Sequence, residues 1–277
     1  MTDHLPKLVN ADFFESWDSF IDLSSVDVVF TDPPYNLFSQ TRLAGDLPFD
    51  DKIDLFQFEE IIDKLLKPNG LLIVFCNLVL FFKMMSVFER FVLWHELIMA
   101  KSSGNFTCRT QPIRVHEYIA VFRRKESAPS DLFFNPYAGE RKGNFYIKKN
   151  VKRLQKTRLT GNPGINIGDP AGRRWLRSVI DSPSRPNLTA EERSATSNPF
   201  QKPEVTIRLL IDTYSRINDL ILDPFAGSSV VLICAQDLNR RSIGFEKHTK
   251  YYGESMLRLK KVNDKKLVEG WLFVHSN

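Results

Sequence analysis

A short apolar run that ends in two consecutive prolines constrains the fold of this chain most. Residues Val26 to Phe30 are mostly β-branched or aromatic, which predicts a strand. The run stops at Asp32-Pro33-Pro34, because two prolines supply no N–H group for a ladder and cannot continue a central strand. Asp32 is therefore expected just past the carboxyl end of a strand, where open α/β sheets bind their ligands.

Tyr35 follows this turn directly. The residue before a proline is held extended, so Asp32 projects its carboxylate in a fixed direction. A carboxylate and unpaired carbonyl groups beside an aromatic ring suit a planar base that carries an amino group. The alternative for the same residues is a strand followed by a proline-rich turn without chemistry.

The composition is that of an ordinary globular protein with a basic balance. A chain of 277 residues buries a full core in one large domain, or in one domain with a small insertion. Its net charge of +5 and pI near 9.0 are compatible with a polyanionic partner but do not establish one.

The cysteines and the amino terminus indicate a reducing compartment. Cys76, Cys108 and Cys234 form no CxxC pair and no cluster with histidine, so neither a metal site nor a disulfide framework is expected. The first ten residues have no signal-peptide pattern, and the most apolar segment, Leu71 to Phe82, is too short to span a bilayer. We therefore expect a cytoplasmic protein without a membrane span.

Strand and helix patterns alternate along most of the chain. The pattern predicts strands over residues 7–10, 26–30, 70–76, 94–101, 117–122, 220–223, 242–246 and 270–274, and helices over 53–67, 78–91, 198–216 and 248–261. Such alternation predicts right-handed crossovers and a doubly wound, mostly parallel α/β sheet. The polar segment Leu37 to Asp51 is interpreted as a flap that orders on substrate, with a plain surface loop as the alternative.

The segment between Arg123 and about Ser197 has a different character. Its hydrophobic periodicity fades, and basic residues gather with the aromatic residues Phe145, Tyr146 and Trp175 between them. Basic side chains neutralise phosphates and aromatic rings contact bases, so this pattern indicates nucleic-acid binding. A charge run is also typical of a merely solvated surface.

A second glycine-containing turn lies near the end of the chain. The expected strand Leu220 to Asp223 runs into Pro224 to Ser229, whose small residues let a ligand approach the backbone. The next expected strand ends at Glu246, whose carboxylate is placed to accept hydrogen bonds from ribose hydroxyls.

These two stretches resemble one known family. Asp32-Pro33-Pro34-Tyr35 is similar to the catalytic tetrapeptide of S-adenosylmethionine-dependent amino-methyltransferases that act on DNA bases, and Asp223 to Ser229 is similar to their cofactor loop, Asp-Pro-Phe-x-Gly-x-Gly. Their order in the chain resembles that of the β class, a circular permutation. The resemblance implies a Rossmann-like methyltransferase fold, S-adenosyl-L-methionine as cofactor, and Asp32, Pro33, Pro34 and Tyr35 as the catalytic residues.

The resemblance also implies the residues that hold the cofactor: Asp12, Phe200, Lys202, Asp223, Pro224, Phe225, Gly227, Ser228 and Glu246. An N-cap of the following helix is the alternative for Asp12, and an exposed lysine after a helix start is the alternative for Lys202. Two residues depart from the family pattern. Ser229 replaces the last glycine, and its hydroxyl is expected to cap the next helix, while Asn198 stands where histidine is common.

The resemblance implies that the basic segment is the target-recognition region. The expected division is a catalytic half over residues 1–123, an insertion with its linker over 124–197, and a cofactor-binding half over 198–277. The candidate contacts to double-stranded DNA are Arg141, Lys142, Lys148, Lys149, Lys152, Arg153, Arg158, Arg173 and Arg174. A homodimer and a cognate restriction endonuclease are left open as partners.

The resemblance implies transfer of a methyl group to the N6 amino group of adenine, because aspartate at the first motif position favours adenine in the family. The Asp32 carboxylate and the Pro33 carbonyl would accept the amino hydrogens, without a covalent enzyme intermediate. The pair His116-Glu117 is expected to position the catalytic loop. The alternatives are an N4-cytosine methyltransferase and a non-catalytic DNA-binding relative.

Overall fold

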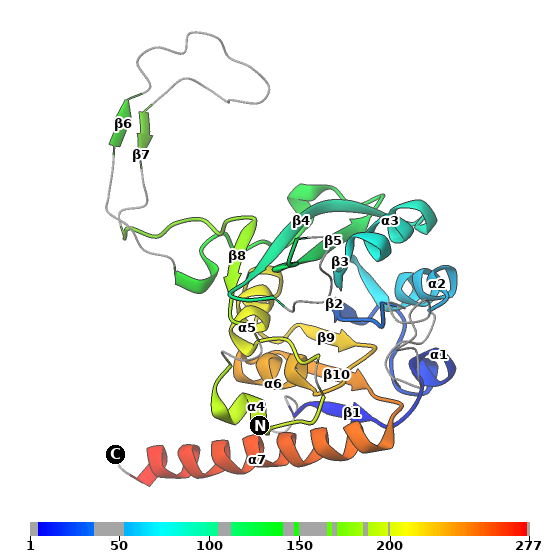
Figure 1. Ribbon diagram of the computed structural model, residues 1–277, viewed down its shortest axis with the longest axis vertical. Coiled ribbons are helices and arrows are strands. Elements are labelled where there is room, and N and C mark those ends of the chain that lie inside the picture. Colours follow the sequence, from blue (N-terminus) through cyan, green and yellow to red (C-terminus); the bar gives the residue numbers. More distant parts are fainter. Residues whose placement is uncertain are drawn as a thin grey trace. The chain divides into compact units, whose positions relative to one another are not determined.

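The computed structural model describes residues 5–35, 53–104, 112–140, 147–149, 165–167, 171–184, 188–198 and 200–275. It consists of two compact units, Met1–Phe134 together with Ser178–Asn277, and Asn135–Arg177. The first unit contains the large sheet and the helices α1 to α7 (Figure 1). The second lies within the segment expected as an insertion, 124–197, whose remaining residues belong to the first unit.

Eight strands form the large sheet. Across the sheet they follow the order β1 (Lys7–Val9), β10 (Arg241–Phe245), β9 (Leu220–Asp223), β2 (Val26–Thr31), β3 (Leu66–Cys76), β5 (His116–Arg124), β4 (Phe91–Lys101) and β8 (Val179–Ser182). Only β5 runs antiparallel to its two neighbours; all other adjacent pairs are parallel. The predicted mostly parallel α/β sheet is therefore confirmed. Strand β2, which precedes the predicted catalytic motif, pairs directly with β9, which precedes the predicted cofactor loop.

Helices cover both faces of this sheet (Figure 1). They are α1 (Phe13–Ser16), α2 (Leu55–Leu65), α3 (Leu78–Val87), α4 (Ala190–Ser194), α5 (Glu204–Tyr214), α6 (Val230–Asp237) and α7 (Thr249–His275), with short 3-10 turns η1 (Trp17–Ser19), η2 (Pro129–Asp131) and η3 (Ala138–Glu140). One apolar core packs the sheet against α5, α6 and Leu259 of α7, and the other packs it against α1, α2 and α3. Alternate residues of β2 enter the two cores, Phe30 the first and Val29 the second, as the period of a strand requires.

Local capping explains where several helices begin. The Asp54 carboxylate accepts hydrogen bonds from the backbone N–H groups of Phe56 and Gln57, so α2 starts at Leu55. The Asn77 side chain caps α3 in the same way by accepting from Leu80 N. The helix predicted to reach Phe91 ends at Val87, because Phe91 already begins strand β4.

Two predicted elements were wrong in part. The helix expected from Asn198 begins at Glu204, because proline at 199 and 203 keeps the preceding residues out of the helical region. The strand expected over residues 270–274 is instead the end of α7, which continues to His275. No proline interrupts the chain from Thr249 onward, and extending an existing helix costs less than starting a new element.

The second unit contains a small antiparallel ribbon of β6 (Ile147–Lys149) and β7 (Ile165–Ile167). Of the predicted DNA contacts, Lys148 and Lys149 lie in β6, while Arg173 stacks its guanidinium 4.3 Å from the ring centre of Tyr137. Arg174 follows it. Arg141, Lys142, Lys152, Arg153 and Arg158 lie outside the described residues, as does the expected flap over residues 37–51.

Candidate active site

The strand ends of the first unit bring acidic side chains to one edge of the sheet. Parallel strands share that edge at their carboxyl ends, so Asp32 after β2, Asp223 of β9 and Glu246 after β10 are neighbours in this row. Strand β5 runs the other way and therefore presents its amino end, with Glu117, at the same edge. Open α/β sheets bind ligands in the crevice at this edge.

A cavity of about 1270 Å³ opens at this edge. It is larger than the few hundred cubic ångströms that one small ligand usually fills, so it has room for two ligands side by side. The predicted catalytic and cofactor-binding residues all line it: Asp12, Asp32, Pro33, Pro34, Tyr35, Phe200, Lys202, Asp223, Pro224, Phe225, Gly227, Ser228 and Glu246. The loop near the start of the chain and the glycine turn near its end thus share one cavity.

Both carboxylate oxygens of Asp32 have a partner. The Tyr35 hydroxyl donates to Oδ1 at 2.5 Å, and the Lys202 ammonium lies 2.8 Å from Oδ2. A carboxylate accepts about four hydrogen bonds, so each oxygen retains a lone pair for a further donor. The contact with Tyr35 shows that this ring orients Asp32 through its hydroxyl, a role that the sequence did not predict.

Lys202 also joins Asp32 to a second carboxylate. Its Nζ forms an ion pair with Glu117 Oε2 at 2.9 Å, and Glu117 Oε1 accepts from Lys101 Nζ at 2.6 Å. Lysine and carboxylate alternate along this row, which compensates charges that are largely buried. Lys202 is therefore not the exposed lysine that the alternative interpretation required.

Burial and these neighbours shift the pKa values of the row. Burial raises the pKa of Asp32, and the Lys202 ammonium opposes that rise. Burial also acts to raise the pKa of Glu117, but the ammonium groups of Lys202 and Lys101 outweigh it and hold that pKa at about 2. The two carboxylates outweigh burial at Lys202 and raise its pKa, so it stays a cation and does not act as a base.

Asp223 links the catalytic strand to the cofactor loop. Its Oδ1 accepts a hydrogen bond from the Thr31 hydroxyl at 3.2 Å and from Phe225 N at 3.1 Å. Burial raises the pKa of Asp223 to about 7, and these two donors lower it. At neutral pH this carboxyl group is therefore poised between its two protonation states.

The turn after Asp223 has two residues in the left-handed region. Gly227 has φ of 49°, and a Cβ built on it would lie 3.0 Å from Asn198 Nδ2. Ser229 has φ of 56°, and its hydroxyl is fully buried without a hydrogen-bond partner in the described part of the chain. The expected cap by Ser229 is therefore wrong: Ser229 stands at the N-cap position of α6, but its side chain makes no capping hydrogen bond.

Asp12 and Glu246 stand at the other end of the cavity. The Asp12 side chain caps α1 by accepting from Phe14 N at 2.9 Å, and Glu246 Oε1 accepts from His248 N at 2.7 Å. Both carboxylates also line the cavity, so the N-cap and the ligand-facing interpretations of Asp12 are compatible. Burial raises the pKa of Glu246, which the N–H group of His248 opposes.

The described residues include possible metal ligands and two of the cysteines. Among those residues no three histidine, cysteine, aspartate or glutamate side chains are grouped closely enough to hold a metal ion. Cys76 and Cys234 are buried free thiols, and burial raises the pKa of Cys76 to about 12. In the same residues, every helix is too short or too polar for a membrane span.

The sequence missed the connection between Lys101, Glu117 and Lys202. The pair His116-Glu117 was expected only to position the loop, and the spacing of these residues along the chain gives no sign that they meet. The meeting depends on the antiparallel direction of β5, which brings its first residues to the carboxyl edge of its neighbours and which no pattern in the sequence indicates.

Comparisons with known proteins agree with this geometry. The family model of the N6/N4 DNA methylases matches residues 26–256. The type II methyltransferase M2.LlaDCHI of Lactococcus lactis subsp. cremoris is 26% identical over 278 aligned positions, covering 92% of this chain and 89% of that protein.

Solved structures show the same fold. The structure of the M1.HpyAVI–SAM complex superposes with a TM-score of 0.59 at 20% identity, covering 92% of this chain and 99% of that one. The PvuII DNA methyltransferase, described as cytosine-N4-specific, gives a TM-score of 0.65 at 15% identity over 95% of this chain and 92% of that one. With the match to the family model extending over most of the chain, this protein belongs to the DNA methylase family, the S-adenosylmethionine-dependent amino-methyltransferases of DNA.

Proposed function

We propose that this protein transfers a methyl group from S-adenosyl-L-methionine to the N6 amino group of adenine in double-stranded DNA. The observation that carries the proposal is the Asp32 carboxylate, which lies in the same cavity as Asp223 and Glu246 and is held between Tyr35 and Lys202. Aspartate at the first motif position favours adenine over cytosine in the family that this chain resembles.

The chain's own residues prepare the amino group for attack. The lone pair of an adenine amino group is delocalised into the ring, which makes that nitrogen a weak nucleophile. When Asp32 and the Pro33 carbonyl accept its two hydrogens, the nitrogen is drawn towards tetrahedral geometry and its lone pair becomes available. Lys202 favours the ionised form of Asp32. The ionised carboxylate accepts an amino hydrogen in the ground state and continues to accept it as charge develops in the transition state.

The cofactor fits the donors and acceptors on the other side of the cavity. When bound, it supplies a methyl group on a positively charged sulfur. In this proposal Glu246 accepts from ribose hydroxyls, Asp12 from the adenine end, and Asp223 from the ammonium group of the methionine end. Support comes from the three carboxylates, which all line the cavity. The positive φ of Gly227 and its missing side chain let the cofactor approach the backbone.

Residues 135–177 and the basic residues of the insertion are proposed to hold the DNA. The target base must leave the duplex to reach Asp32, which costs a few kcal/mol. Phosphate contacts by the lysines and arginines of this segment supply sequence-independent affinity, so binding should weaken steeply as salt rises. The enzyme would act on DNA in the cytoplasm.

A product assay tests the proposal. Purified protein is incubated with methyl-labelled cofactor and double-stranded DNA, and the digested nucleosides are separated by mass spectrometry. We expect label in N6-methyladenine, and no label above background with Asp32→Ala, which should still bind the cofactor. Label in N4-methylcytosine would show that the target base is cytosine instead of adenine. Cofactor binding without any label in DNA would support the non-catalytic alternative.

A further inference from the structure

The long helix α7 presents one polar face to the cofactor cavity's supporting loops. Glu254 and Ser255 precede Arg258 by four and three residues, so both lie on the side of the helix that carries Arg258. Ser255 and Arg258 are buried, with 1% and 7% of their surface exposed. A buried arginine is costly unless its donors are used, so its partners indicate what it holds in place.

The first segment that this face holds is the glycine turn. The Ser255 hydroxyl donates to the Gly227 carbonyl at 2.7 Å, and Arg258 Nη1 donates to the Ser228 carbonyl at 2.9 Å. Gly227 and Ser228 line the cavity and precede the first turn of α6. The carbonyl oxygens of this cavity-lining turn are thus held by α7.

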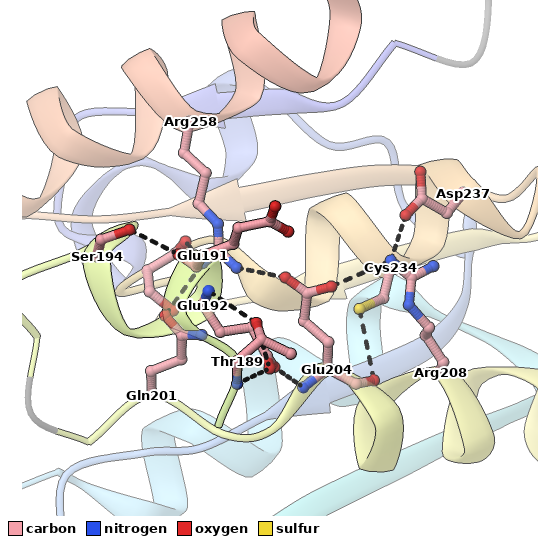
Figure 2. Close-up of polar contacts among 11 residues, drawn as sticks. Thr189, Glu191, Glu192, Ser194, Gln201, Glu204, Arg208, Cys234, Asp237 and Arg258 are labelled. Atoms are coloured by element: carbon pink, nitrogen blue, oxygen red, sulfur yellow. Dashed lines mark hydrogen bonds and ion pairs between the residues drawn. The ribbon is translucent and has the colours of Figure 1, made fainter. Parts of the chain in front are cut away.

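The second segment, between α4 and α5, also lines the cavity. Arg258 Nη1 also donates to Gln201 Oε1 at 3.2 Å, and Nη2 donates to Glu204 Oε1 at 2.7 Å (Figure 2). The Glu254 carboxylate accepts from Ser197 N and from the Ser197 hydroxyl, both at 2.7 Å. Residues 200–202 lie outside any helix, and the contacts from Glu254 and Arg258 are among those that hold this segment.

Further contacts hold Glu204 so that it can pair with Arg258. Glu204 Oε2 accepts from Arg208 at 3.2 Å, and Arg208 also pairs with Asp237 at the end of α6 (Figure 2). The Glu192 carboxylate, which completes the capping box of α4, accepts from Glu204 N at 3.0 Å. Arg258 is therefore the one residue of this group that bonds both the glycine turn and the segment around Gln201.

We propose that Arg258 is a positioning residue that sets the separation of the two segments between which the cofactor binds. The inference rests on the cofactor placement proposed above. One guanidinium bonds Ser228 on one side and Gln201 on the other, and Gln201 precedes Lys202, which reaches Asp32. Without Arg258, the cofactor must order the segment around Gln201 when it binds. The entropy cost of that ordering reduces the affinity for the cofactor.

The chain offers a matched control in Arg240. It is also buried, with 6% exposed, and it donates to the Ser215 hydroxyl and to the carbonyls of Ser215 and Leu238. It precedes β10 and therefore lies at the opposite edge of the sheet from the cavity. Arg240→Met should lower the free energy of unfolding as Arg258→Met does. It removes no contact to the glycine turn or to the segment around Gln201.

The experiment measures the Kd of S-adenosyl-L-methionine by calorimetry and the unfolding midpoint in urea for the wild type, Arg258→Met, Arg258→Lys and Arg240→Met. We expect Arg258→Met to raise the Kd at least tenfold, Arg258→Lys to recover part of the loss, and Arg240→Met to leave the Kd within twofold. At saturating cofactor, Arg258→Met should keep kcat within a few fold of the wild type. The binding measurement needs no DNA, so an error in the proposed target base leaves it interpretable.

Two results would overturn the proposal: an unchanged Kd in folded Arg258→Met, or an equal rise of the Kd in Arg240→Met. If Arg258→Met does not fold, the milder variant Arg258→Gln takes its place, because it keeps a polar side chain that is too short to bond both segments. That variant should raise the Kd severalfold. An unchanged Kd in it would then refute the proposal.

Discussion

The Lys202 ammonium lies 2.8 Å from the Asp32 carboxylate, although the two residues come from opposite halves of the chain. This contact joins the catalytic motif to the segment that follows α4, and Glu117 extends it at 2.9 Å from Lys202. The ionisation of Asp32 thus depends on three separate segments of the chain: the turn after β2 with Tyr35, strand β5 with Glu117, and the segment before α5 with Lys202. Four predictions follow from this arrangement and from the cofactor turn.

Lys202→Met should slow methyl transfer and move its pH dependence. Without the ammonium, burial raises the pKa of Asp32 further, so the acid limb of the single-turnover rate should shift to higher pH. We expect a lower rate at pH 7 that recovers as the pH is raised, because a larger share of Asp32 is then ionised. Lys83→Met on the exposed side of α3 serves as the control and should leave the profile in place.

Glu117→Gln should move the same acid limb in the opposite direction. The Glu117 charge raises the pKa of Asp32, so its removal favours the ionised carboxylate and shifts the limb to lower pH. The glutamine still accepts a hydrogen bond from Lys101 or Lys202, so the loss of rate should be only a few fold. A shift towards higher pH would show that Glu117 acts through the position of Lys202 instead of its own charge.

Asp223 should make the cofactor-free protein less stable as the pH rises from about 4 to 7. Burial raises its pKa to about 7, so the folded protein binds a proton there that the unfolded chain, with a carboxyl pKa near 4, has already lost. The slope is at most about 1.4 kcal/mol per pH unit. Urea unfolding at pH 5, 6, 7 and 8 should show a flatter profile for Asp223→Asn. Glu117, with its pKa held at about 2, contributes only at lower pH.

Ser229→Gly should stabilise the protein. The present serine has φ of 56° and a buried hydroxyl without a partner among the described residues, and each feature costs about 1 kcal/mol or more. The greater freedom of glycine in the unfolded chain offsets up to about 1 kcal/mol of the gain. We expect a net gain of about 1 kcal/mol, or a rise of roughly 2–4 °C in Tm measured by calorimetry.

Ser229→Ala separates the two causes. It removes the buried hydroxyl but keeps a side chain in the left-handed region, so it should recover only part of the gain. A lower Tm in both variants would mean that the hydroxyl has a partner outside the described residues and that the departure from the family's glycine stabilises the turn.

The sequence by itself determined the features that depend on neighbours in the chain. Consecutive prolines end β2 at Asp32, strand and helix periods alternate, and small residues follow Asp223, so the α/β class and the positions of Asp32 and Asp223 at strand ends were predictable. Glu246 was placed by the same local logic, at the end of a short apolar strand. The family resemblance added Asp12, Phe200 and Lys202, which also line the cavity.

Only the tertiary structure decided which side chains meet. Strand β5 runs against its neighbours, which brings Glu117 to the row of Asp32 and Lys202, and α7 folds back so that Arg258 reaches Ser228 and Gln201. Hydrophobic periodicity and composition describe single helices and strands. They contain no information on contacts between residues far apart in the sequence. Ion pairs and hydrogen bonds between distant residues depend on strand order and helix packing, which the whole core determines together.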